Sequence, residues 1–236
     1  MNGCGPPLIV FAGGGASATL AAVALLRSTT WLRLEYRLVI ADEHGRHGRG
    51  AALARRGRLD APARVMSALP DRPAHLLEWA RRSGLPCSPG TFLPCRVYGD
   101  YLSETLSETA AWAEPYAVVA LRTDRVLRAA PEGGAVAVSL AAGGMLHAAA
   151  AVLATGDPGA GSLPATRLPR PPSSRARLDT CPRGAVLGPD GRAERRLFAV
   201  GPVRRDHPGS GPARAGEQAE LLAGLITDTV LRSGRR

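Results

Sequence analysis

A glycine-rich segment near the start of the chain has the residue types and the spacing that bind a diphosphate group. Residues 7–12 form an apolar run of strand length, and a helical pattern rich in alanine and leucine follows the glycines. Gly13, Gly15 and Ala18 match the pattern G-x-G-x-x-G/A, in which the glycines allow a tight turn and a close approach of backbone to pyrophosphate, and the small third residue lets the helix pack on the sheet. The helix N-terminus then directs free N–H groups at the phosphates. The predicted contacts are Gly13, Gly15, Ala16, Ser17 and Ala18.

An acidic residue follows at the distance that a dinucleotide site requires. A second apolar strand, Tyr36–Ala41, ends in Asp42-Glu43, and Asp42 lies 24 residues after Ala18. A ribose-binding acid is expected roughly 20 residues beyond the glycine pattern. Asp42 is the predicted ribose contact because it closes the strand, and Glu43 is the alternative. A glycine-rich turn can also serve packing alone, but this context favours dinucleotide binding.

The loop after the second strand is rich in glycine and arginine. A loop at this point lies at the carboxyl edge of the sheet, where open α/β folds bind ligands. Arg46 or Arg49 is therefore a candidate for facing a phosphate or the adenine, and the alternative is a basic loop in solvent. His44 and His47 have no metal-ligand company in the sequence and stay unassigned.

The composition excludes several classes of protein. The chain has 236 residues, a formal charge of +10 and no lysine, so every basic residue apart from histidine is arginine. A P-loop, a Schiff-base enzyme and a short-chain dehydrogenase each need a lysine. Aromatic residues make up only 4% of the chain, which argues against a nucleic-acid surface. We therefore expect no nucleic-acid partner. No apolar run reaches the ~20 residues of a membrane span, so we also expect a cytoplasmic protein with no membrane partner.

The cysteines predict no site. Four cysteines lie far apart and form no C-x-x-C pair, so we expect neither a zinc site nor a redox dithiol.

Periodicity in the rest of the chain predicts an α/β fold with a parallel sheet, a β-meander and a C-terminal strand-helix unit. Tyr98, Tyr101, Leu102 and Leu106 follow helical spacing and are expected in the core rather than at a cofactor. Residues 59–69 are expected to be loop. The other predicted helices are His75–Arg82, a helix that begins within Phe92–Leu102 and runs to about Ala113, and Ala213–Leu231. The other predicted strands are Tyr116–Leu121, Arg125–Ala130, Ala135–Leu140, Met145–Ala149 and 150–157.

Several further segments carry a resemblance to a known family. They are Gly48-Arg49-Gly50, Pro62–Ser67, Phe92–Leu102, Ala154-Thr155-Gly156 and Arg196–Pro202. With the first glycine turn, their order resembles that of flavin-dependent oxidoreductases of the FAD/NAD(P)-binding superfamily, in particular a bacterial group of FAD-NAD(P)-binding proteins.

The resemblance implies a Rossmann-like FAD-binding fold over residues 1–236 as a single domain. The Pro/Ser/Arg-rich linker 158–177 stands where the family has a larger insert, the expected place of a nicotinamide or substrate module, and Cys95 stands where the family has arginine. The resemblance therefore implies FAD more strongly than turnover with NAD(P)H. It also implies that the last helix aims its positive end at the flavin. The contacts that it implies are Arg49, Met66, Ser67, Val126, Thr155, Gly156, Gly201 and Pro202.

Three functions are compatible with these features. The first is an FAD-dependent oxidoreductase that acts on a small molecule in a biosynthetic pathway, with NAD(P)H, a partner reductase or another external source of electrons. The second is a flavin-fold protein in which FAD is structural, acting as a cyclase, an isomerase or a binder of a partner. The third is an NAD(P)-dependent dehydrogenase. His207 is the weak candidate for a catalytic proton donor, and a homo-oligomer is a further expectation.

Overall fold

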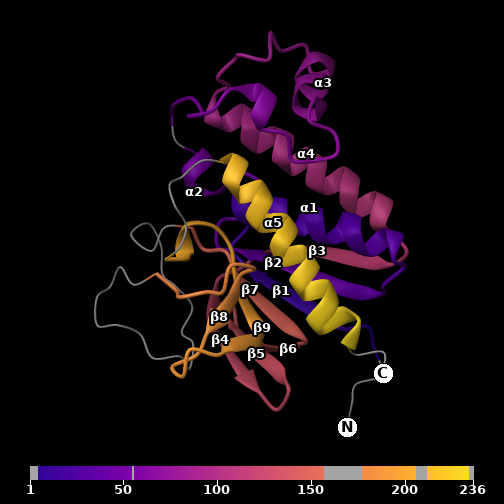
Figure 1. Ribbon diagram of the computed structural model, residues 1–236, viewed down its shortest axis with the longest axis vertical. Coiled ribbons are helices and arrows are strands. Elements are labelled where there is room, and N and C mark those ends of the chain that lie inside the picture. Colours follow the sequence, from indigo (N-terminus) through magenta and orange to yellow (C-terminus); the bar gives the residue numbers. More distant parts are fainter. Residues whose placement is uncertain (1–4, 55, 157–176, 206–211, 234–236) are drawn as a thin grey trace.

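A parallel sheet forms the centre of the molecule. The computed structural model describes residues 5–54, 56–156, 177–205 and 212–233. Within these ranges the main sheet has six strands, and all neighbours are parallel except β8, which runs antiparallel to β9 (Figure 1). In spatial order the strands are β3 (Ala117–Thr123), β2 (Tyr36–Asp42), β1 (Leu8–Ala12), β7 (Ala150–Leu153), β9 (Ala193–Ala199) and β8 (Ala185–Leu187).

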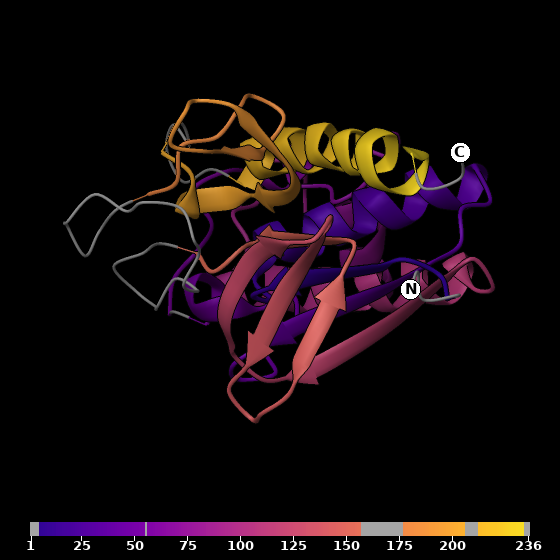
Figure 2. The ribbon, with the colours of Figure 1, turned by 90° about the horizontal axis from the view of Figure 1, so that it is seen from below.

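A second, antiparallel sheet covers one face of the first. It has the order β4 (Val126–Glu132), β5 (Ala135–Leu140) and β6 (Met145–Ala148), so consecutive strands pair as a meander. Figure 2 shows this meander on one side of the main sheet and the long helices on the other. The described part of the chain therefore has three layers.

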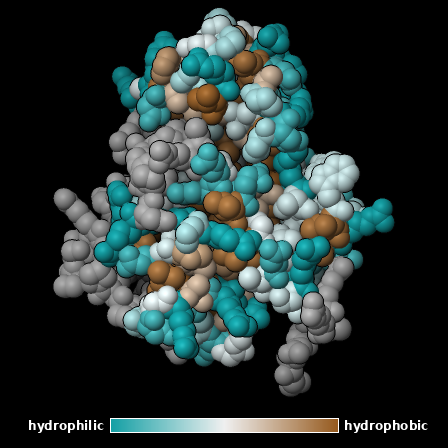
Figure 3. Space-filling view, viewed as in Figure 1, coloured by the Kyte–Doolittle hydropathy of each residue, from teal (hydrophilic) through white to brown (hydrophobic). Residues whose placement is uncertain are grey.

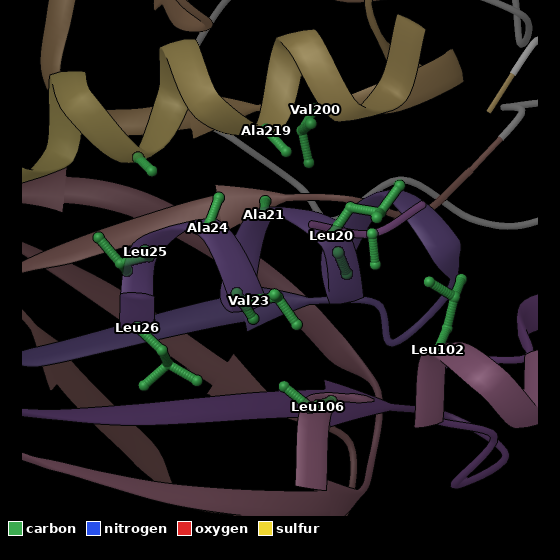
Figure 4. Close-up of a cluster of buried hydrophobic side chains, with 14 of the residues drawn as sticks. Leu20, Ala21, Val23, Ala24, Leu25, Leu26, Leu102, Leu106, Val200 and Ala219 are labelled. Atoms are coloured by element: carbon green, nitrogen blue, oxygen red, sulfur yellow. The ribbon is translucent and has the colours of Figure 1, made fainter. Parts of the chain in front are cut away.

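The helices form the opposite layer. α1 packs against both α4 and α5, and Figure 4 shows the side chains between them, including Leu20 and Ala24 of α1 and Ala219 of α5. Among the described residues, no helix is both long and apolar enough to cross a membrane. The helices are α1 (Ala16–Trp31), α2 (Gly50–Leu53), α3 (His75–Arg82), α4 (Cys95–Ala113) and α5 (Pro212–Ile226), with the 3-10 turns η1 (Ala63–Val65) and η2 (Gly201–Val203) and the π-helical turn η3 (Thr227–Leu231).

Strand β1 is apolar on both faces because both faces are covered. Ile9 and Phe11 lie in the core cluster on the helix side, and Val10 and Ala12 lie in the cluster on the meander side. Successive side chains of a strand point to opposite faces, so a central parallel strand reads as a continuous apolar run. Burying a side chain such as Ile9 or Phe11 contributes about 1.5–3 kcal/mol.

The structure confirms the predicted fold class and most of its elements. Helix α3 and strand β5 have the predicted bounds, and Tyr98, Tyr101, Leu102 and Leu106 are buried as expected. Strand β8 was not predicted, because three residues carry too little periodicity and the strand depends on pairing with β9. The segment 59–69 contains η1 and is not loop throughout. The predicted linker 158–177 lies outside the described residues except for its last residue.

Candidate dinucleotide-binding site

The first glycine of the pattern lies where the ends of three strands meet. The N–H of Gly13 donates to the carbonyl of Ala41 on β2 at 2.7 Å. Its φ is +107°, and a Cβ at this position would lie 2.5 Å from the carbonyl oxygen of Ala154, which follows β7. Both the left-handed backbone and this close approach require glycine. The structure therefore confirms the turn predicted from sequence. The first position must be glycine because the residue that follows β7 packs against it.

The start of α1 has the electrostatic character that favours an anion. Gly15 is the N-cap residue, and no side chain caps the helix or places an acid in its first turn. The first N–H groups of a helix have no partner within the helix, and its N-terminus carries a partial positive charge. Ala18 is completely buried, as the third position of the pattern requires. The backbone of Ala16 and Ser17 therefore belongs to a helix end suited to phosphate.

The loop after β2 folds onto the glycine turn. The N–H of Gly48 donates to the carbonyl of Gly14 at 2.8 Å. Gly50 has a φ of +48°, and a Cβ there would lie 2.7 Å from the Cα of Gly15. The resemblance singled out Gly48-Arg49-Gly50, and the structure shows that its glycines permit this contact of backbone against backbone.

The guanidinium of Arg49 is paired within the protein. Its Nε donates to Oδ1 of Asp100 on α4 at 2.7 Å, and both side chains are about half exposed. Contact of Arg49 with a phosphate stays a prediction, and it requires the side chain to share or leave this carboxylate.

The carboxylate of Asp42 accepts hydrogen bonds from the glycine turn and from the loop after β2. Oδ2 accepts from the N–H of Gly14 at 3.1 Å, and Oδ1 accepts from the N–H groups of His44 and Arg46 at 3.1 and 2.9 Å. A carboxylate oxygen can accept two hydrogen bonds, so Oδ2 retains capacity for a ribose hydroxyl. Glu43 is exposed and lies 3.7 Å from Arg125. The ribose contact itself stays a prediction.

The C-terminal part of the main sheet ends against the start of α1. Gly201 has a φ of +80°, and a Cβ there would lie 2.4 Å from Oγ and 2.7 Å from Cβ of Ser17. The N–H of Gly201 donates to Oε1 of Gln218 on α5 at 3.1 Å. The structure thus brings Gly201 and Pro202 of η2 to the same place as the glycine turn, as the resemblance implied.

Two buried polar atoms beside the turn have no hydrogen-bond partner within the described ranges. They are Oγ1 of Thr155 and Nδ1 of His47. Nδ1 of His47 lies 2.7 Å from the position that a Cβ of Gly14 would take, and the backbone of Thr155 lies beside Gly13. Burial lowers the pKa of His47, and the charge of Asp42 acts in the opposite direction. Because buried polar groups normally have partners, these atoms fit a ligand placed at the turn.

Sequence reasoning missed His47. Its neighbour Gly14 comes from another part of the chain, and Asp42, five residues before it, does not by itself mark a buried histidine. The one available signal was its position inside the glycine-rich loop at the carboxyl edge of the sheet.

The remaining predicted contacts occupy different surroundings. Met66 is only 1% exposed and packs in the helix-side core. The hydroxyl of Ser67 lies within hydrogen-bond distance of the carbonyls of Leu69 and Arg72 and can donate to one of them at a time. Val126 packs in the meander-side core with Ala12. Gly156, with a φ of +79°, follows Thr155, and His207 lies outside the described residues.

Comparison with solved structures gives matches of low sequence identity. A thioredoxin reductase from Gloeobacter violaceus matches with a TM-score of 0.57 and 13% identity, over 98% of this chain and 96% of that one. A variant of the flavin monooxygenase from Stenotrophomonas maltophilia matches with a TM-score of 0.42 and 23% identity over 65% of this chain. The match spans only 39% of that monooxygenase's length. At these identities the likeness concerns the fold.

The family assignment comes from sequence models. Comparison with curated proteins found no match. The model of the FAD-NAD(P)-binding family matches residues 10–158, which is more than half of the chain and includes the glycine turn, the loop after β2 and the strand that ends at Thr155. On this match, and on a fold that unites those segments at one helix end, the chain belongs to the FAD-NAD(P)-binding family.

Proposed function

We propose that this chain binds FAD at the start of α1 and acts as a flavin-dependent oxidoreductase on a small molecule. The observation that carries the proposal is the contact of Gly201 with Ser17. It places the end of β9 against the same helix end as the glycine turn, so both ends of a long dinucleotide can be held by one chain.

The diphosphate and the ribose of the cofactor have residues suited to them. The backbone at Gly15, Ala16 and Ser17 would hold the diphosphate, and Asp42 would accept from the ribose. The bound cofactor would provide a hydrogen-bond partner for the buried polar atoms of Thr155 and His47. The bound flavin would supply hydride or oxygen chemistry, so the protein needs to bind, orient and exclude water rather than provide a nucleophile.

Electrons would come from outside the chain. NAD(P)H or a partner reductase is the proposed source, in keeping with the family's FAD-NAD(P)-binding description. A role in a biosynthetic pathway, a cytoplasmic location and assembly with a second copy of the chain are further proposals.

The test begins with the absorbance spectrum of the purified chain. We expect the bands of oxidised flavin, and bleaching of those bands when NADH or NADPH is added without oxygen. If neither NADH, NADPH nor photoreduction without dithionite bleaches the flavin, a structural cofactor with no redox turnover is favoured instead. A colourless protein that refuses added FAD and binds NADH would favour a dehydrogenase.

A matched pair of variants locates the site. Gly15→Ala adds a methyl group at the helix end, where a Cβ meets only Gly50 at 3.6 Å, so the fold tolerates it. Gly90→Ala adds the same group where no atom lies within 4 Å. We expect Gly15→Ala to lose FAD at least tenfold more readily than Gly90→Ala. Equal retention would place the diphosphate elsewhere.

A further inference from the structure

A cavity of about 540 Å³ lies between the segment 64–73 and the outer side of α5. This is within the range of small-molecule sites, about 300–1,000 Å³. Figure 3 shows the face that carries α5, on which apolar patches interrupt a hydrophilic surface. The cavity is lined by Arg64, Val65, Ser67, Leu69, Pro70, Pro73, Gly216, Glu217, Glu220 and Leu221.

The wall opposite α5 is held in place from several directions. Ser67 accepts from the N–H of Leu69, and its single hydroxyl hydrogen lies within reach of the carbonyls of Leu69 and Arg72. The hydroxyl of Tyr101, on α4, accepts from the N–H of Ala68 at 2.9 Å. Arg27 of α1 forms an ion pair with Asp71. The cavity is therefore formed before any ligand arrives, which lowers the entropy that binding must lose.

Two large apolar side chains line the cavity from its two walls while remaining open to solvent. Val65 on η1 is 46% exposed, and Leu221 on α5 is 47% exposed. Both residues line this cavity, together with prolines of the 64–73 segment. An apolar ligand body placed between them would remove both from water at about 25 cal/mol per Å² of apolar surface.

The charges of the cavity are mostly negative and have no ion-pair partner in the part of the chain that the structure describes. Glu217 and Glu220 come from α5, and Arg64 comes from the opposite wall. The packing around Glu220 raises the pKa of its carboxyl, while Arg27 acts in the opposite direction. Arg27 and Asp71, which both act on Glu220, form an ion pair with each other. The remaining balance of two carboxylates against the guanidinium of Arg64 favours a cationic ligand.

The same helix connects the cavity to the cofactor site. Gln218 lies between Glu217 and Glu220 in sequence and accepts from the N–H of Gly201. Gly201 in turn lies against Ser17 at the start of α1. A molecule in the cavity is thus within a turn of α5 of the residue that contacts η2.

We propose that this cavity binds a small apolar molecule that carries one basic amine, with the amine at Glu217 and Glu220 and the apolar body between Val65 and Leu221. The inference rests on the proposed function in one respect, namely that the bound amine is the substrate of the flavoprotein.

The test uses three probes of nearly equal shape and different charge: tryptamine, the neutral alcohol tryptophol, and indole acetate. Their affinities for the full chain are measured by calorimetry at low salt. We expect tryptamine to bind about fivefold more tightly than tryptophol, as one partly exposed ion pair allows, and indole acetate to bind most weakly. Glu217→Gln with Glu220→Gln removes this preference, and Glu35→Gln, an exposed acid before β2, retains it.

The outcomes separate this proposal from the preceding one. Equal affinities for the three probes, no binding of any, or an amine preference that survives in the double variant would each overturn the cavity assignment. Leu221→Ala weakens all three probes to a similar extent if the apolar wall is correct. Flavin content is read by absorbance on the same preparations, so a colourless protein that still prefers tryptamine refutes the flavin proposal alone.

Discussion

Replacing Gly201 by alanine tests whether the end of β9 lies against the start of α1. The new methyl group would overlap Oγ and Cβ of Ser17, at 2.4 and 2.7 Å. The Cβ of Ser17 is fixed to the helix backbone, so rotating the hydroxyl cannot relieve the overlap. Overpacking of this kind costs about 1–3 kcal/mol, and an alanine at positive φ costs about 1–2 kcal/mol more.

A double-mutant cycle separates these two costs. Ser17→Gly removes both overlapping atoms, so Gly201→Ala should lose only the backbone cost in that background. We expect a coupling free energy of about 1–3 kcal/mol between the two substitutions. Gly84→Ala serves as the control, because Gly84 has a φ of +67° and no atom lies within 4 Å of its added Cβ.

The measurement is urea unfolding followed by circular dichroism. Residues that do not touch give additive changes within about 0.5 kcal/mol. Additive losses for Gly201→Ala and Ser17→Gly would therefore refute the contact. The shared cofactor site built on it would fall as well.

Three further predictions concern individual side chains. Asp42→Ala leaves three backbone N–H groups without their acceptor, so we expect a loss of about 2 kcal/mol in the free energy of unfolding by urea, with weaker binding of FAD in a titration. Burial lowers the pKa of the His75 imidazole in the folded protein. As the pH drops below about 6.5, the unfolded state therefore binds a proton before the folded state does, and the free energy of unfolding should fall. This fall should be smaller in His75→Gln, and an equal fall in that variant would contradict this role of His75. Arg49→Ala breaks a half-exposed ion pair with Asp100 and should change stability by less than about 1 kcal/mol, while a salt-sensitive loss of FAD affinity would show a phosphate contact.

Much of the fold could be predicted from local patterns. The strand, turn and helix around Gly13 follow one another directly in the sequence, so a local pattern predicts them. The side chains of β1 are apolar because the helices cover one face of the strand and the meander covers the other. Residue types at fixed spacing therefore indicated the dinucleotide turn. The three residues of β8 could not be predicted, because the strand is defined by pairing with β9 and with the segment 179–181 rather than by a pattern of its own.

The predicted cofactor contacts divide in the same way. Asp42 was identified from its place at the end of β2, but its bonds to three backbone N–H groups depend on how two loops meet. Arg49 was expected at a phosphate, and its pairing with Asp100 arises from the packing of α4. The only signal for His47 was its position in the glycine-rich loop after β2, because its burial beside Gly14 depends on how this loop folds onto the glycine turn.

By itself the sequence determined most of the elements, the glycine turn and the acid that follows it, because each depends on backbone preferences and periodicity within a short stretch. Only the tertiary structure decided that Gly201 lies on Ser17, that Thr155 and His47 lie beside the turn with buried polar atoms, and that Glu220 shares a cavity with Val65. The physical reason is that these contacts join segments that lie far apart in the sequence, such as Ser17 and Gly201. Side-chain packing between layers sets such contacts, and no local pattern encodes them.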